Sequence, residues 1–254
     1  MERFYVDPEN IASGKARITG DELKHLKNVL RLKSGDQVEV FDGAGKGYQG
    51  RLTNIDQTYA VVDIEDPVTE IRDSALRIIL AQGLPKGEKM DTVVQKNTEL
   101  GLSAIIPLEL SRCVVKLEGE NKRRDRQSRW QKIAREAARQ CGRLYVPEVF
   151  PPMGLPSFLR QVAPEDLLLI PWEEGGQPLK PYFAGLDDRL GACRLREKKL
   201  YIMIGPEGGM TADEVEAGIK AGGIALTLGP RLLRTETAGQ ALASVLQYLW
   251  GDMG

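Results

Sequence analysis

Cysteine and histidine are scarce in this sequence of 254 residues. The three cysteines, Cys113, Cys141 and Cys193, lie far apart, and no Cys-x-x-Cys pair occurs. An odd number of scattered cysteines argues against a disulfide framework and is typical of a reducing compartment, so we expect a cytoplasmic protein. His25 is the only histidine, and together with these cysteines it forms no recognisable zinc-ligand spacing, so we expect no metal site.

Long hydrophobic runs and a strong net charge are also missing. The most apolar stretches, such as residues 167–170 and 200–204, have only the length of strands, so we expect no membrane span. The N-terminus has no apolar run behind a basic start, so we expect no secretory signal. The net charge is −1, but residues 121–143 contain nine Lys or Arg and only two acids. Such a local basic density can bind phosphate even in a nearly neutral chain.

The first part of the chain, residues 1–72, has the pattern of a small β-rich domain. Residues 38–41, 48–55 and 59–64 have the composition and spacing of short strands, which is typical of a small barrel. Thr19 followed by Glu22 resembles a capping box and predicts a helix that ends near residue 32. The polar, proline-containing residues 65–73 mark the domain boundary.

The second part, residues 73–254, alternates strands with helices. Strands are predicted at residues 76–81, 104–110, 167–171, 200–204 and 224–228. Helices are predicted at residues 89–100, 126–140, 211–221 and 237–250, the third opened by a capping box at Thr211 and Glu214. This alternation predicts an α/β domain with a mostly parallel sheet covered by helices on both faces.

Two glycine-containing turns in the second domain are the strongest candidates for a ligand site. Ile204-Gly-Pro-Glu-Gly-Gly209 follows one predicted strand, and Leu228-Gly-Pro-Arg-Leu-Leu-Arg-Thr-Glu-Thr-Ala238 follows the next. Ligands of open α/β sheets bind where strands end and helices begin, and glycine lets the backbone approach them closely. Each turn alone could be a simple tight connection. The two together, in adjacent strand–helix units, indicate a nucleotide-like ligand with apolar walls from leucines.

These turns, with other segments in the same order, resemble the RsmE family of methyltransferases. The resemblance includes His25-Leu-x-x-Val-Leu-Arg31, Val94-Gln-Lys-x-Thr-Glu-Leu-Gly101, Ser111-Arg112, and Arg129-Trp-x-Lys-Ile-x-x-Glu-Ala137 with Gln140-x-x-Arg143. It covers nearly the whole chain. Met210 and Cys141 depart from the Phe and Ser expected there, and neither touches the proposed chemistry.

The resemblance implies a fold and a function. We expect an N-terminal PUA-like small β-barrel that binds RNA, and a C-terminal SPOUT domain with a parallel sheet and a deep trefoil knot. The implied activity is methylation of uridine N3 in 16S rRNA of the small ribosomal subunit with S-adenosyl-L-methionine, by a homodimer. An apolar stripe on the last helix, including Leu242, Leu246 and Leu249, fits a dimer face or an ordinary core equally well. The implied cofactor-binding residues are Pro171, Trp172, Glu173, Ile204, Gly205, Pro206, Gly208, Gly209, Leu228, Gly229, Leu232, Leu233 and Thr237.

Uridine N3 carries a proton, so methyl transfer needs a base and a group that stabilises the resulting negative charge. Arg234 lies inside the second glycine-containing turn, Leu228 to Ala238, and is the candidate for the stabilising charge. Glu236 or Glu207 is the candidate base. Glu236 could instead serve only the helix dipole, and Glu207 could only stabilise its turn.

Contacts with RNA require exposed basic side chains. The residues expected to contact RNA are Arg31, Lys33, Lys86, Arg112, Arg124, Arg139 and Arg143.

Two other functions remain open from the sequence. A non-catalytic RNA-binding ribosome-assembly factor could retain the same domains, although the intact glycine turns argue against a decayed enzyme. A nucleotide-dependent oxidoreductase would need Gly-x-Gly-x-x-Gly after the first strand, and residues 82–87 do not fit that pattern. The turn at residues 43–47 lacks the Ser or Thr and the following helix of a phosphate-binding P-loop, so we expect a hairpin there.

Overall fold

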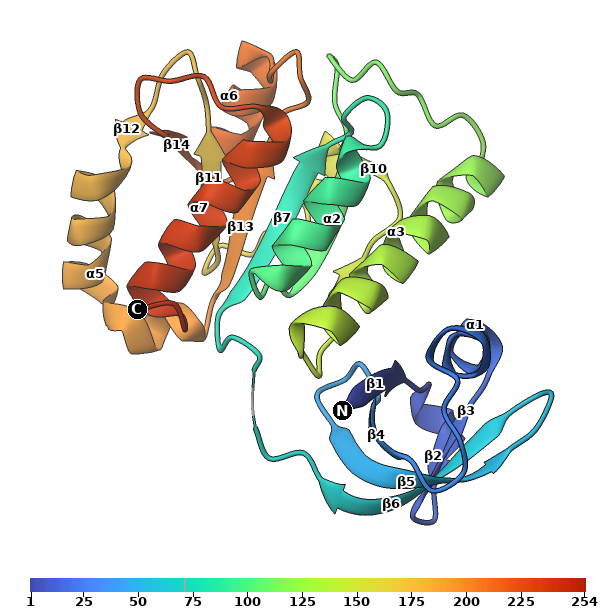
Figure 1. Cartoon of the computed structure of the whole chain (residues 1–254). Helices are drawn as coiled ribbons and strands as arrows, with labels where there is room; N and C mark the ends of the chain where they lie inside the picture. Colours follow the sequence, from blue (N-terminus) through green and yellow to red (C-terminus); the bar gives the residue numbers. More distant parts are fainter. Residues whose placement is uncertain (71) are drawn as a thin grey trace. The chain divides into compact units, whose positions relative to one another are not determined.

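The computed structural model describes residues 1–70 and 72–254, apart from the side chains of residues 189, 190, 192 and 193, so the thiol of Cys193 lies outside the description. The chain divides into two compact units (Figure 1). The first contains Met1–Asp73 and Arg135–Val146, and the second contains Ser74–Ala134 and Pro147–Gly254. The sequence predicted a domain boundary near residue 72. The structure adds residues 135–146, which are distant in sequence, to the β-rich unit. No helix in the described part of the chain is long and apolar enough to cross a membrane.

The first unit is built around a curled sheet of six strands in the order β1-β4-β5-β6-β3-β2 (Figure 1). The strands are β1 (Glu2–Tyr5), β2 (Ile11–Ala12), β3 (Lys15–Ile18), β4 (Gln37–Phe41), β5 (Gly47–Ile55) and β6 (Ala60–Pro67). Two register shifts between β5 and β6 increase the local twist and help the sheet to curl. Alternate residues of the strands, such as Val38, Val40, Leu52 and Val62, point into one core.

The helix of the first unit differs from its prediction. Helix α1 (Gly20–Lys24) continues directly into a π-helical segment, η2 (His25–Leu30), and ends at Arg31 with a φ of 55°. The predicted capping box is wrong, because Thr19 makes no side-chain capping hydrogen bond. Glu22 is instead largely buried, and burial raises its pKa to about 7.

Residues 135–146 are fixed within the first unit by a buried ion pair. The Arg143 guanidinium lies 2.8 Å from an Asp73 carboxylate oxygen, and Arg143 is only 4% exposed. The other Asp73 oxygen accepts hydrogen bonds from the backbone N–H groups of Leu144 and Tyr145. The prediction that Arg143 contacts RNA is wrong in this structure, because its charge is buried against Asp73.

The second unit contains a parallel sheet in the order β10-β8-β7-β13-β11-β14-β12, with β9 beside β8 (Figure 1). The strands are β7 (Arg77–Gly83), β8 (Ala104–Glu109), β9 (Glu148–Val149), β10 (Met153–Gly154), β11 (Leu167–Pro171), β12 (Gln177–Pro178), β13 (Lys199–Ile204) and β14 (Ile224–Thr227). The helices are α2 (Lys89–Glu99), α4 (Leu155–Leu159), α5 (Leu179–Arg196), α6 (Ala212–Lys220), α7 (Thr235–Trp250) and α3 (Glu120–Cys141), whose residues from Arg135 onward belong to the first unit. The predicted α/β domain with a parallel sheet is confirmed.

Helix α7 packs on α2 and on the central strands β7 and β13. Ala238, Leu242 and Leu246 form its buried stripe, whereas Leu249 is exposed. Buried Gln247 links the elements, since its amide accepts from Ser74 at 2.7 Å and donates to the Leu100 carbonyl oxygen at 2.9 Å. The core interpretation of the stripe is therefore confirmed for its buried members.

Helix α6 begins as predicted. The Thr211 side chain accepts from the Glu214 N–H at 3.2 Å, and the Glu214 carboxylate accepts from the Thr211 N–H at 2.9 Å. The second Glu214 oxygen accepts from the Ser111 N–H at 2.7 Å, so this capping box also fixes the segment after β8. The turn at residues 205–209 is thus followed by a rigid helix start.

Candidate functional site: a cavity at the ends of three adjacent strands

A cavity of about 690 Å³ lies at the carboxyl ends of β11, β13 and β14, which are neighbours in the sheet. Three segments form its walls: residues 171–173 after β11, residues 204–209 after β13, and residues 227–236 after β14. This is the edge at which open parallel sheets bind their ligands, and the volume suits a ligand of nucleoside size.

The first glycine turn is too tight for a side chain at its start. A Cβ atom on Gly205 would lie 2.8 Å from the Gly209 carbonyl carbon and 2.9 Å from the Met210 nitrogen. Gly209 has a φ of 69°, and a Cβ there would collide with the Glu173 carboxylate. Glycine therefore lets the backbone of this turn and the neighbouring loop form one wall of the cavity.

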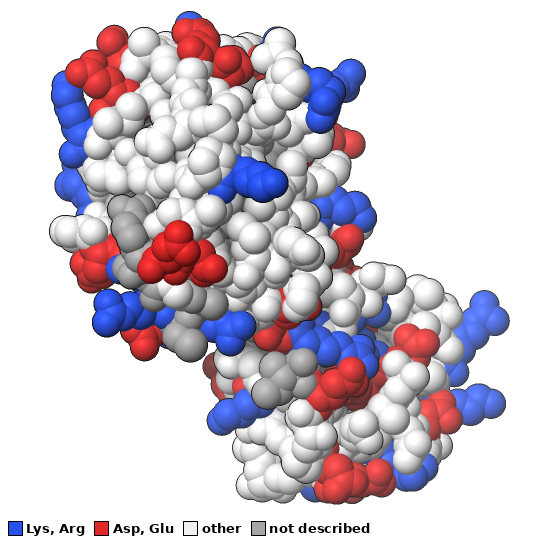
Figure 2. Space-filling view, turned by 90° about the vertical axis from the view of Figure 1, so that its left-hand side faces the viewer, with Lys and Arg blue, Asp and Glu red and all other residues white. Residues whose placement is uncertain are grey.

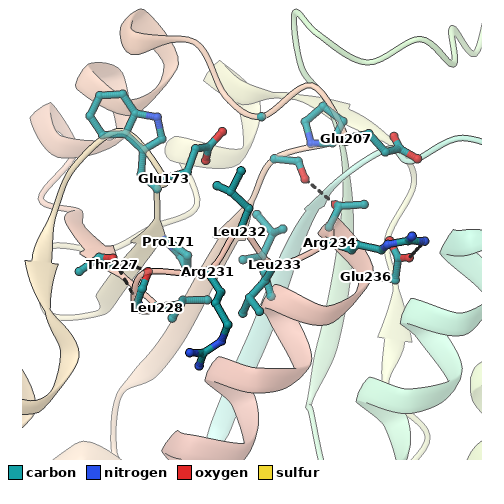
Figure 3. A pocket seen from close by; sticks show the side chains of 18 of the residues that line it. Pro171, Glu173, Glu207, Thr227, Leu228, Arg231, Leu232, Leu233, Arg234 and Glu236 are labelled. Atoms are coloured by element: carbon teal, nitrogen blue, oxygen red, sulfur yellow. Dashed lines mark hydrogen bonds and ion pairs between the residues drawn. The ribbon is translucent and has the colours of Figure 1, made fainter.

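The two ends of the cavity differ in chemistry (Figure 3). Glu173 and Thr227 lie at one end, Leu232 and Leu233 lie near the middle, and Glu207, Arg234 and Glu236 gather at the other end. The lining includes three acids, Glu173, Glu207 and Glu236, and three cations, Lys89, Arg231 and Arg234. A cavity with both signs of charge and apolar walls suits a zwitterionic ligand that carries an aromatic ring.

Two residues of the cavity lining each have a buried polar atom without a hydrogen-bond partner among the described residues. Within the described part of the chain, neither the Trp172 ring nitrogen nor one Glu236 carboxylate oxygen has a hydrogen-bond partner, and both residues line the cavity. Buried polar groups are normally paired, so such atoms at a cavity wall are available to a bound molecule.

The carboxylate of Glu207 is occupied by hydrogen bonds within the protein. It accepts hydrogen bonds from the Lys86 N–H at 3.0 Å and from the Lys89 ammonium at 2.8 Å. Burial by itself raises the pKa of Glu207, but these hydrogen bonds outweigh burial and lower the pKa below its usual value. A carboxylate with a lowered pKa is a weak proton acceptor.

Glu236 and Arg234 flank the first residue of α7. One Glu236 oxygen lies 3.9 Å from the Lys89 ammonium and the other 4.0 Å from the Arg234 guanidinium. The Arg234 side chain is 81% exposed and is therefore accessible to a substrate. Lys89 was not predicted from the sequence, although its place at the start of a predicted helix at this edge of the sheet was a usable signal.

Most of the predicted cofactor-binding residues line the cavity, but Gly208 and Thr237 do not belong to the lining. Arg112, predicted to contact RNA, is exposed and donates to the carbonyl oxygens of Gly208 and Met210 at 2.9 and 3.3 Å, which braces the glycine turn. The side chains of Arg31, Lys33 and Lys86 are exposed. Arg124 pairs with Glu120 and Arg139 pairs with Glu136, each within α3.

Sequence comparison connects this geometry to known proteins. A family model described as an RNA methyltransferase domain matches residues 72–247, and one described as an RNA methyltransferase PUA domain matches residues 18–65. Ribosomal RNA small subunit methyltransferase E of Bacillus subtilis is 33% identical over 252 residues, which cover 98% of this chain and 96% of that protein. The chain belongs to the ribosomal RNA small subunit methyltransferase E family. The predicted family and its PUA domain are thereby confirmed.

Solved structures agree with this assignment. A ribosomal RNA small subunit methyltransferase E from Neisseria gonorrhoeae, bound to S-adenosylmethionine, has a TM-score of 0.87 and 37% identity, with all of both chains covered. A Legionella pneumophila protein in complex with the same molecule has a TM-score of 0.86 and 31% identity, covering 99% of this chain and 98% of that one. Both of these similar structures therefore contain bound S-adenosylmethionine.

Proposed function

We propose that this protein transfers a methyl group from S-adenosylmethionine to ribosomal RNA of the small subunit, at N3 of a uridine. The observation that carries the proposal is the cavity formed by three adjacent strand ends, with Arg234 and Glu236 at one end. A non-catalytic assembly factor would not need this arrangement, so the enzyme is the better interpretation.

The residues of the cavity fit S-adenosylmethionine. Leu228, Leu232 and Leu233 supply apolar walls for an adenine ring, and the turn from Gly205 to Gly209 supplies backbone groups. The unpaired Trp172 ring nitrogen supplies a donor within the described lining. The bound molecule supplies an electrophilic methyl group on a sulfonium.

Glu236 is the proposed base. One of its carboxylate oxygens, 3.9 Å from the Lys89 ammonium, accepts no hydrogen bond from the described residues, so it keeps a lone pair that can take the N3 proton of uridine. Glu207 is less suitable, because hydrogen bonds from Lys86 and Lys89 occupy it and lower its pKa.

Arg234 is the proposed stabiliser of the uridine anion. Removing the N3 proton places negative charge on the two flanking carbonyl oxygens, and an exposed guanidinium beside Glu236 can donate hydrogen bonds to one of them. The base must leave its stack to reach this position. We further propose that residues 1–72, with the exposed Arg31 and Lys33, bind RNA, and that residues 73–254 carry the catalytic site.

The proposed functional unit is a homodimer in the cytoplasm, where its ribosomal substrate is made. Figure 2 shows a broad area of the second unit in which charged side chains are sparse. Leu232, Tyr248 and Leu249 are exposed hydrophobic residues of the third loop and of α7. Covering them by a second copy accounts for their exposure. We also propose that the second unit contains the deep trefoil knot that the SPOUT resemblance implies.

The function is tested by incubating the purified protein with S-adenosylmethionine labelled in the methyl group. Small subunits, large subunits and protein-free 16S rRNA are offered separately, and the RNA is digested to nucleosides. We expect label in 3-methyluridine from the small-subunit RNA alone. Label in another nucleoside would contradict the N3 assignment, and no label from any substrate would contradict the enzyme.

A further inference from the structure

A buried polar network lies at the wall of the cavity and connects three chain segments. Gln82 is the penultimate residue of β7, Gly205 follows β13, and Thr235 begins α7. The Thr235 hydroxyl donates to the Gly205 carbonyl oxygen at 2.6 Å and accepts from the Gln82 amide nitrogen at 2.8 Å. The same Gln82 nitrogen donates to the Gly83 carbonyl oxygen at 3.0 Å.

Because these groups are buried, the loss of one of their hydrogen bonds is costly. Gln82 is 0% exposed and Thr235 is 7% exposed, so water does not replace a lost partner freely. A hydroxyl has one hydrogen to donate, and here it is directed to Gly205 because the Gln82 amide can only donate from its nitrogen. Hydrogen bonds in such an environment are strong, and leaving one partner unpaired is costly.

The network lies between the two groups that the chemistry requires. Thr235 stands between Arg234 and Glu236 in the chain, so its position sets where both side chains enter the cavity. Gly205 opens the glycine turn that forms the cofactor wall. A shift of Thr235 relative to Gly205 therefore moves the catalytic pair relative to the bound methyl donor.

We infer that Gln82 and Thr235 are positioning residues that fix the 234–236 turn against the cofactor turn. This inference rests on the proposed methyltransferase function. Disturbing the network should therefore lower the rate of methyl transfer more than it weakens binding of S-adenosylmethionine.

The test replaces Thr235 by Val, which keeps the shape and removes the hydroxyl. Thr235→Ser, which restores the hydroxyl, is the conservative variant. Thr98→Val is the matched control, because Thr98 is also buried, donates from its hydroxyl to the Val94 carbonyl oxygen at 2.8 Å, and lies outside the cavity. Calorimetry gives the Kd for S-adenosylmethionine, thermal unfolding gives Tm, and methylation of small subunits gives kcat and KM.

We expect Thr235→Val to lower kcat by about 10- to 100-fold, because a displacement of about 1 Å near the reacting groups has effects of that size. The Kd should change by less than about threefold, which is below 1 kcal/mol. Thr235→Ser should recover most of kcat, and Thr98→Val should lower only Tm. Gln82→Met keeps the hydrogen bond between Thr235 and Gly205, so its kcat should fall less.

A kcat of Thr235→Val within about twofold of wild type, with either Tm or Kd changed, would show a purely structural role and overturn the inference. If Thr235→Val is too unstable to assay, an unchanged kcat in Gln82→Met overturns it instead. Absence of methylation by the wild-type protein in the same assay would contradict the proposed function itself, so the two failures are distinguishable.

Discussion

Replacing Gly205 by Ala should weaken binding of S-adenosylmethionine without unfolding the protein. The added Cβ would lie 2.8 Å from the Gly209 carbonyl carbon and 2.9 Å from the Met210 nitrogen. Non-bonded heavy atoms prefer about 3.5–4.0 Å, so the turn must open by roughly 0.6–1.2 Å. Both obstructing atoms belong to the backbone, so no side chain can rotate away to relieve the contact.

The size of the effect follows from this displacement. Overpacking of a close contact costs about 1–3 kcal/mol. If the cost falls on the conformation that binds the ligand, affinity drops by about 5- to 150-fold. Titration calorimetry with S-adenosylmethionine measures this drop, and NAD provides the ligand control.

Gly185→Ala is the matched control variant, because a Cβ at this position in α5 meets nothing within 4 Å. It should bind S-adenosylmethionine like the wild type. Equal affinity of Gly205→Ala and wild type would refute the assignment of this turn as a cofactor wall. Binding of NAD, and not of S-adenosylmethionine, by the wild-type protein would also refute this assignment.

Four further substitutions test other parts of the structure. Burial, followed by repulsion from Glu136, raises the pKa of Glu22 from 4.5 to about 7. The folded state therefore binds the proton more tightly, and stability should fall by about 3 kcal/mol as the pH rises from about 4.5 through 7. Glu22→Gln should abolish that decline in urea unfolding at several pH values, and an unchanged slope would disprove the cause. Asp73→Ala removes the carboxylate beside buried Arg143 and should cost about 3–5 kcal/mol in the same assay, whereas a loss below about 1 kcal/mol would mean that the pair is dispensable. Arg234→Ala should bind S-adenosylmethionine and keep the oligomeric state of the wild type in light scattering. Its methylation rate should fall by about 100-fold or more, as expected for loss of charge stabilisation, and a wild-type rate would contradict the role of Arg234. Glu236→Gln should lower the rate by about 100- to 10,000-fold, the contribution typical of a general base, and a rate that rises normally with pH in this variant would argue against Glu236 as the base.

The sequence predicts the second unit well because its signals are local. Short apolar strands alternate with amphipathic helices, and the Thr211 capping box uses residues three positions apart. Both glycine turns could be located because each directly follows a strand. Helix α5 was missed, since Pro181, Gly185 and Gly191 interrupt its pattern and Gly191 has non-helical dihedral angles.

The parts that were not predicted depend on contacts between distant residues. The Thr19 box failed because Glu22 is buried beside residues that follow it by more than 100 positions, including Arg139 and Glu136. Arg143 was predicted to contact RNA, but its guanidinium is paired with Asp73, which lies 70 positions earlier in the chain. The network of Gln82 and Thr235 joins positions 153 residues apart, and no pattern along the chain reveals such a pair.

The central claim is that this protein methylates one uridine of small-subunit ribosomal RNA. The most direct measurement is mass spectrometry of that RNA from cells in which the gene has been deleted and then restored. We expect 3-methyluridine to disappear in the deletion, to return with the wild-type protein, and not to return with Arg234→Ala. Unchanged 3-methyluridine in the deletion, or full recovery with Arg234→Ala, would contradict the account.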